Sequence, residues 1–171
     1  MNRTEWWLRG PVEGVAPALQ PVAHILLEVR ETVGPMVEGL TESQWNARPG
    51  GVASVAFHVR HIAGVVDRLF TYARGATLTP EQVTAMRGEG AELRADDVSA
   101  ALDALAARLD AAVAELRTVD AASLGDHRAI GRAKLPSTVI GCLVHAAEHA
   151  MRHTGQLSVT ARVVRATTPS A

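Results

Sequence analysis

The apolar residues of this chain recur with the period of an α-helix, and no segment shows the alternation of a β-strand. In residues 97–118, for example, they recur every three or four positions, which places them along one face of a helix. We therefore expect an all-α fold without strands, with the chain forming a single domain over residues 1–171. Long helices are expected over four segments, at about 17–39, 53–74, 97–118 and 137–165.

Turn and capping residues separate these segments. The "RPGG" turn at 48–51 leads to Ser54, a candidate N-cap, and Gly75 is a candidate stop for the same helix. The link that follows, 75–96, is long, and its "TPEQ" predicts a short helix near 80–87. Residues 119–136 are expected to be loop. Four long helices with two long links predict a four-helix bundle.

Charge and cysteine content limit the classes of function. The 17 basic and 18 acidic side chains give a net charge of −1, so nucleic acid and anionic membranes are not expected partners. No apolar run approaches the roughly 20 residues of a membrane-spanning helix, and the first residues lack the apolar core of a signal peptide. Cys142 is the single cysteine, which excludes an intramolecular disulfide, and we expect a cytoplasmic protein.

Five of the seven histidines fall into two helical clusters. In "HAAEHAMRH", His145, His149 and His153 follow one another at four-residue spacing, so neighbouring rings lie roughly 5–6 Å apart at Cβ. His58 and His61 form a second cluster on the predicted helix at 53–74. Burying several imidazoles without partners is costly, and a divalent metal bound by both clusters would offset that cost. Three nitrogens would leave coordination positions open to water or substrate.

The same histidines match other patterns less well. Such pairs are also frequent on solvated helix surfaces. The "HAAEH" string matches a zinc-protease motif, but Glu148 points about 100° away from His149 along the helix. A ferritin-like di-iron site needs glutamates that the segment 53–74 lacks. Haem ligation by two histidines is compatible with a bundle, although the polar Gln156 on the same face favours a bare ion.

Three stretches together, "WNARPGGVAS", "VAFHVRHIAG" and "HAAEHAMRHTGQL", resemble the DinB/YfiT-like superfamily of metal-binding four-helix bundles over about residues 17–160. The resemblance implies an up-up-down-down bundle, for which 75–96 would be a crossover, and a homodimer. It also implies a divalent metal held by His61, His149 and His153. His58 and His145 lie one helical turn before His61 and His149, respectively. They are candidates for partners of the ligands, for substrate contacts or for alternative ligands.

The resemblance further implies a metal-dependent transferase that joins a low-molecular-weight thiol, of the bacillithiol or mycothiol type, to a small-molecule electrophile. Zn²⁺ is the expected ion, with Ni²⁺ as its rival, and coordination would favour the reactive thiolate. Arg68 is a candidate to hold a carboxylate of the thiol, or else a surface arginine. Gln156 is a candidate to orient a ligand or a water, or to bond across the bundle.

The alternative is a non-catalytic metal-binding module for stress response or sensing. The same three histidines serve either function, and the sequence assigns no catalytic residue. A fourth protein ligand would favour the non-catalytic function, because it would close the site.

Overall fold

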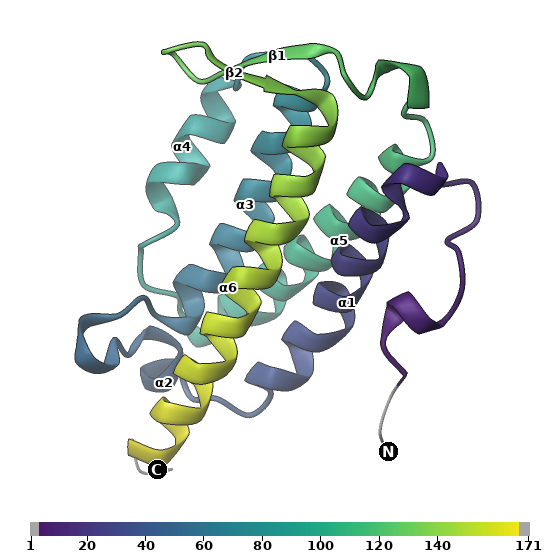
Figure 1. The fold of residues 1–171 in the computed structure, drawn as a ribbon. Helices are drawn as coiled ribbons and strands as arrows, with labels where there is room; N and C mark the ends of the chain where they lie inside the picture. The colour runs from purple at the N-terminus through teal and green to yellow at the C-terminus, as the bar shows by residue number, and fades with distance from the viewer. Residues whose placement is uncertain (1–3, 168–171) are drawn as a thin grey trace.

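The computed structural model describes residues 4–167 and has four long helices packed side by side (Figure 1). They are α1 (Gln20–Val37), α3 (Val55–Ala73), α5 (Val98–Leu116) and α6 (Val139–Thr167), at the four predicted places. The predicted short helix is α4 (Pro80–Gly88), and α2 (Glu42–Asn46) is an additional short one. Single 3₁₀ turns lie at Trp6–Leu8, Pro17–Leu19, Pro49–Gly51, Ala95–Asp97 and Ala121–Ser123.

Local chemistry sets where α3, the first histidine-bearing helix, begins. Gly50 and Gly51 both have positive φ, 61° and 81°, and they make the turn that the "RPGG" pattern predicts. The Ser54 hydroxyl then accepts a hydrogen bond from the backbone N–H of Phe57 at 3.2 Å, as an N-cap does. The helix start is thereby fixed one turn before His58.

The contacts between helices show their directions, and the expected up-up-down-down order is wrong. α3 and α6 are antiparallel, α1 and α6 are parallel, and α3 and α5 are parallel, which gives an up-down-down-up bundle (Figure 1). An up-up-down-down bundle needs two long crossovers, whereas this chain has one, the α4 segment that returns the chain from the end of α3 to the start of α5. The contacts that define the directions are His61–His149, His58–His153, Arg108–Asp67 and Arg74–Glu115 between side chains, and Arg165 to the backbone carbonyl oxygen of Met36.

Apolar side chains from all four long helices fill the centre of the bundle. Leu26 of α1, Ile62 of α3, Leu109 of α5 and Leu157 of α6 are completely buried. Burying each such side chain stabilises the folded state by about 1.5–3 kcal/mol relative to leaving it exposed. The packing of this core therefore holds the histidine-bearing helices in register. None of the helices within residues 4–167 combines the length and apolarity that a membrane crossing requires.

A two-stranded hairpin caps one end of the bundle, which corrects the expectation of no strands and of a loop over 119–136. β1 (His127–Ile130) pairs antiparallel with β2 (Leu135–Thr138), with His127 opposite Thr138. Each strand has only four residues and lies largely open to solvent, so no apolar alternation marks it. Pro136 fits in β2 because a two-stranded hairpin consists of edge strands, which tolerate proline.

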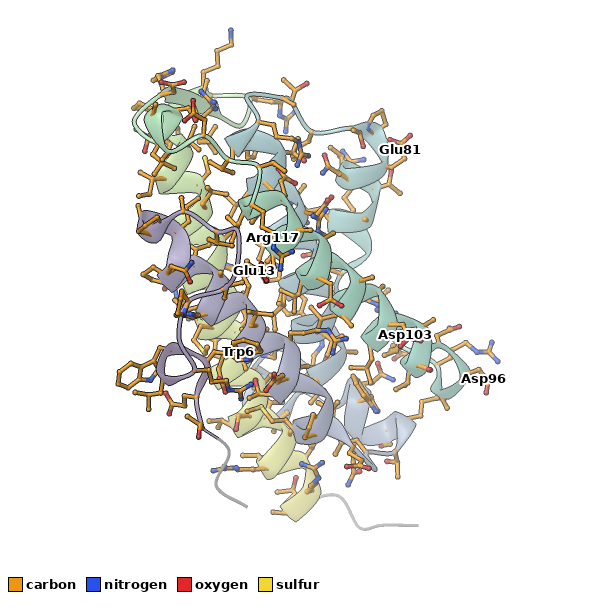
Figure 2. The ribbon with its side chains drawn as sticks, turned by 90° about the vertical axis from the view of Figure 1, so that its right-hand side faces the viewer. Trp6, Glu13, Glu81, Asp96, Asp103 and Arg117 are labelled. Carbon is orange, nitrogen blue, oxygen red and sulfur yellow. The ribbon has the colours of Figure 1, made fainter. Side chains whose placement is uncertain are left out.

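Hydrogen bonds and an ion pair made by arginine side chains hold the segment before α1 against the bundle. Arg117, at the end of α5, donates from Nε to the carbonyl oxygen of Glu13 at 3.0 Å, and Figure 2 shows the two residues side by side. Further along, Arg9 makes an ion pair with Glu31 of α1 at 3.0 Å. These contacts lie on the α1–α5 side, away from the histidines of α3 and α6.

Candidate metal centre

Three histidines from two antiparallel helices converge, as the sequence predicted. His61 comes from α3, and His149 and His153 come from successive turns of α6. Each offers a ring nitrogen, and these three nitrogens lie within 4.8 Å of one another. All three side chains are partly buried between the helices. This trio could hold a metal ion.

The spacing within the trio suits one divalent ion. Zn²⁺ binds imidazole nitrogens at about 2.0–2.1 Å in a tetrahedral site, which puts two ligand nitrogens about 3.3 Å apart. The Nε2 atoms of His61 and His149 are 3.0 Å apart, so a small rotation of either ring makes room for an ion between them. The donor set is all nitrogen, which suits Zn²⁺ and other first-row transition metals.

Glu89 orients the His61 ring, although no pattern in the sequence indicates this residue. Its Oε2 accepts a hydrogen bond from Nδ1–H of His61 at 2.7 Å, which leaves the Nε2 lone pair facing the trio. A carboxylate on the far nitrogen of a metal-binding histidine is a recurrent arrangement that fixes the ring and its tautomer. Glu89 directly follows α4 on the crossover, and no local pattern in 75–96 indicates that it reaches α3.

Arg68 holds the other oxygen of the same carboxylate. Its Nη1 donates to Oε1 of Glu89 at 2.6 Å, and both side chains are buried. Arg68 therefore faces the site from behind His61, as a partner of Glu89. Neither role considered from the sequence, a contact to the carboxylate of a thiol or an exposed surface arginine, describes this position.

Gly64 makes room for this pair of charges. A Cβ atom at position 64 would lie 2.3 Å from Oε1 of Glu89 and 2.6 Å from Nη1 of Arg68, closer than real Cβ contacts come. Any larger residue would push the two side chains apart. Gly64 is the glycine of "RHIAG", three residues after His61, and a glycine inside a helix is the one signal in the sequence for this close approach.

The two additional histidines have different surroundings. His58 is buried, and its Nδ1 lies 3.0 Å from Nδ1 of His153, a hydrogen bond that leaves Nε2 of His153 for an ion. His145 is exposed on α6, with Nδ1 3.5 Å from Oε2 of Glu148. Phe57 stacks on the His61 ring at 4.9 Å between centroids and further restricts its rotation.

The titration of these groups favours the forms that bind metal. Burial, with the neighbouring His61 as a smaller cause, lowers the pKa of His58 and of His153 to about 4, and burial also lowers the pKa of His149. The rings are therefore neutral near pH 7, as ligands must be. Burial alone would raise the pKa of Glu89, but hydrogen bonds from His61 and Arg68 outweigh it and keep the carboxyl ionised.

A pocket of about 580 Å³ opens beside His58. Gln156 is exposed at its rim, and its side chain forms no hydrogen bond with any residue from 4 to 167, so it bonds neither across the bundle nor to a histidine of the site, and a role in orienting a water stays a prediction. Both apolar and polar side chains line this pocket, and His58, the hydrogen-bond partner of His153, is one of them. Its lining residues are Val52, Ala53, His58, Arg152, Gly155, Gln156, Val159 and Thr160.

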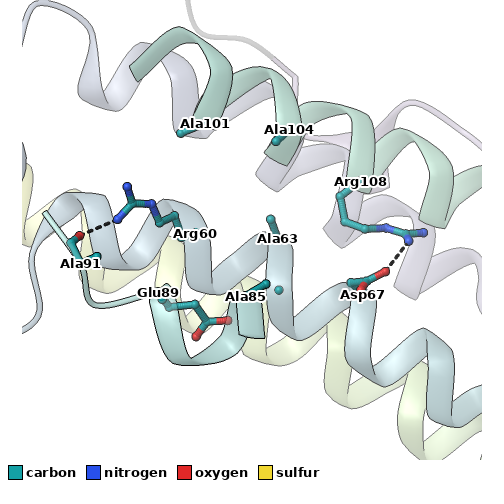
Figure 3. A pocket seen from close by; sticks show the side chains of 11 residues that line it. Arg60, Ala63, Asp67, Ala85, Glu89, Ala91, Ala101, Ala104 and Arg108 are labelled. Carbon is teal, nitrogen blue, oxygen red and sulfur yellow. Dashed lines mark hydrogen bonds and ion pairs between the residues drawn. The ribbon is translucent and has the colours of Figure 1, made fainter. Parts of the chain in front are cut away.

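A second pocket, of about 570 Å³, lies on the other side of Glu89, between α3, α4 and α5 (Figure 3). Small side chains such as Ala63, Ala101 and Ala104 form its walls. Each carboxylate in it is already paired, Asp67 with Arg108 at 2.8 Å and Glu89 with Arg68. Of these two pockets, this one is lined by Glu89 and the other by His58.

Fold and site together define a helical bundle with a three-histidine cluster able to hold a divalent ion. A family model described as the DinB superfamily matches residues 25–157, more than half of the chain and the whole histidine cluster. The chain belongs to the DinB superfamily. A search of curated proteins finds no match to it.

Proposed function

We propose that this protein binds one divalent metal ion through His61, His149 and His153 and uses it to transfer a low-molecular-weight thiol to a small electrophile. The observation that supports the proposal most is the convergence of three imidazoles whose donor atoms lie within 4.8 Å of one another. The resemblance to metal-dependent thiol transferases supplies the reaction class, and a thiol of the bacillithiol or mycothiol type is the expected co-substrate.

When bound, the metal would supply Lewis acidity that lowers the pKa of a thiol and makes the thiolate available near pH 7. The chain's own residues prepare the ligands for this. Glu89 accepts from Nδ1–H of His61 and so directs Nε2 of that ring towards the trio, and His58 occupies Nδ1 of His153. Three protein ligands leave a position for an outside group, as catalytic zinc sites do.

The pocket beside His58 is the proposed space for the small molecules. Val52 and Val159 offer apolar surface, while Arg152 and Gln156 offer polar groups at the rim. Arg152 pairs with Glu148 through Nε and Nη2, and its remaining Nη1 suits a carboxylate, a group that a thiol of the bacillithiol type carries. Arg152 thus takes over the role that the sequence analysis considered for Arg68.

Metal analysis and a thiol-transfer assay test the proposal together. Protein purified without a histidine tag should contain about one Zn²⁺ or Ni²⁺ per chain, and His149→Ala should lose it. Bacillithiol or mycothiol with a model electrophile should react at a rate that depends on the metal. His127→Ala, an exposed histidine on the hairpin, is the matched control and should keep both properties.

Full metal occupancy without turnover across a broad panel of thiols and electrophiles would favour the alternative, a metal-binding module for stress response or sensing. A chain that binds no metal would contradict both. The homodimer that the resemblance implies stays a prediction, which sedimentation of the metal-loaded protein checks.

A further inference from the structure

We propose that His145, Glu148 and His149 form an outer metal position on the solvent side of α6, from which a divalent ion passes to the inner trio. This inference rests on the proposed function, since it assumes that His61, His149 and His153 bind the ion at equilibrium. The outer position would increase the rates at which the ion binds to and dissociates from the inner trio.

The outer residues carry a recognised donor set for divalent transition metals. Two imidazoles and one carboxylate are the ligands of many such sites with open positions. One donor atom from each of His145, Glu148 and His149 lies within 4.8 Å of the other two. They lie three and four residues apart on one helix, so a single element holds all of them on one face.

Exposure separates the two positions. The His145 and Glu148 side chains are 51% and 46% exposed, whereas that of His61, in the inner trio, is 18% exposed. A hydrated ion therefore reaches the outer pair directly, while reaching the inner trio requires it to lose water between two packed helices. An open pocket of about 370 Å³ adjoins His145 and Glu148 and gives the ion's remaining waters room.

His149 belongs to both groups and links them. Its Nε2 faces His61 at 3.0 Å, whereas its Nδ1 is buried and has no hydrogen-bond partner within residues 4–167. A neutral imidazole carries one lone pair and one N–H, so this ring can serve one ion at a time. Transfer of the ion from the outer to the inner position would exchange the ligands His145 and Glu148 for His61 and His153, while the proton on His149 moves to its other ring nitrogen.

Glu148 is prepared for a cation without losing its present partner. Arg152 donates from Nε to Oε1 of Glu148 at 2.8 Å, while the other oxygen, Oε2, lies on the side of His145. Arg152 keeps the carboxylate charged and fixes its direction, and Oε2 stays available to the ion. The positive charge of Arg152 makes this position weaker than the inner one, as an entry position has to be.

The test is the kinetics of Zn²⁺ uptake by the metal-free full-length protein, followed by stopped flow against a fluorescent zinc chelator. His145→Ala, Glu148→Gln and the double variant should take up Zn²⁺ about 5–10-fold more slowly, because they lose the exposed ligands and the charge that capture the ion. Release should slow by a similar factor, so the equilibrium affinity should stay near that of the unaltered protein. His127→Ala and Glu81→Gln, exposed positions outside the site, are the matched controls.

The possible results separate this inference from the proposed function. Unchanged uptake rates in the double variant would overturn the outer position and leave the inner site intact. A large loss of equilibrium affinity in His145→Ala, comparable to that in His149→Ala, would also overturn it, because His145 would then be a ligand of the inner ion. Two ions bound at once per chain would contradict the sharing of His149. Failure of the unaltered protein to bind Zn²⁺ would overturn the proposed function itself, and this inference with it.

Discussion

At the scale of single residues, the site depends on a carboxylate that reaches it from the crossover. Replacing Glu89 with glutamine keeps the shape but removes the charge that holds His61, so we expect Zn²⁺ affinity to fall about 10–100-fold. Glu92→Gln, an exposed neighbour on the same link, should bind as the unaltered protein does. Competition titration against a chelator measures both. Equal affinities would show that the bond to Glu89 does not orient the ligand.

Gly64 provides a second residue-scale prediction. Gly64→Ala places a Cβ against Glu89 and Arg68, so the buried ion pair has to shift, and we expect a loss of about 1–3 kcal/mol in stability. Gly88→Ala, in α4, meets no atom within 4 Å and should be neutral or slightly stabilising. Urea unfolding of the metal-free variants gives the comparison. A Gly64→Ala protein as stable as Gly88→Ala would mean that the pair relaxes freely.

The residue-scale results also show what the sequence could and could not provide. The trio was predictable because four-residue spacing on one helix places His149 and His153 side by side, and the resemblance supplied His61. Glu89 was not, since its position depends on how the crossover returns along α3, and the order of residues alone does not determine that path. The role of Arg68 was missed for the same reason, because its partner was unknown.

At the scale of elements, the start of α4 has a capping box, formed by Thr79 and Gln82 in both directions. Thr79→Ala removes it and should lower stability by about 1 kcal/mol. Thr84→Ala, inside the same helix, should change stability little, since alanine favours helix. Chemical unfolding distinguishes the two. Equal stability of the two variants would contradict the prediction. Because Glu89 follows α4 directly, Thr79→Ala should also weaken Zn²⁺ binding slightly.

Elements with strong local signals were predicted well, and those without were not. Caps, stops and apolar periodicity gave the four long helices and α4 with small errors at their ends. The hairpin was missed because β1 and β2 are too short and too exposed to show a strand pattern. The helix directions were also wrong, because they depend on the number of crossovers, and the 75–96 link accounts for one only.

At the scale of the whole molecule, the buried histidines link stability to pH. In the metal-free protein His58 and His153 have a pKa of about 4, whereas the unfolded chain has the ordinary value of 6.5. Between these values the unfolded chain binds more protons than the folded one, so stability falls as the pH is lowered from 6.5 towards 4. Well above pH 6.5 both states carry neutral rings, and this contribution to the pH dependence vanishes.

Urea unfolding in the presence of a chelator, at steps between pH 4 and 7.5, tests this linkage. We expect a loss of at least about 1 kcal/mol over the lower part of this range, after allowing for screening at the partly exposed His153. His58→Gln keeps a polar partner for His153 but does not titrate, so its profile should be flatter than that of the unaltered protein. His127→Gln, on the exposed hairpin, should leave the profile unchanged. If His58→Gln and His127→Gln give the same slope, His58 does not share in the linkage, and the cost of charging the cluster lies on α6 alone.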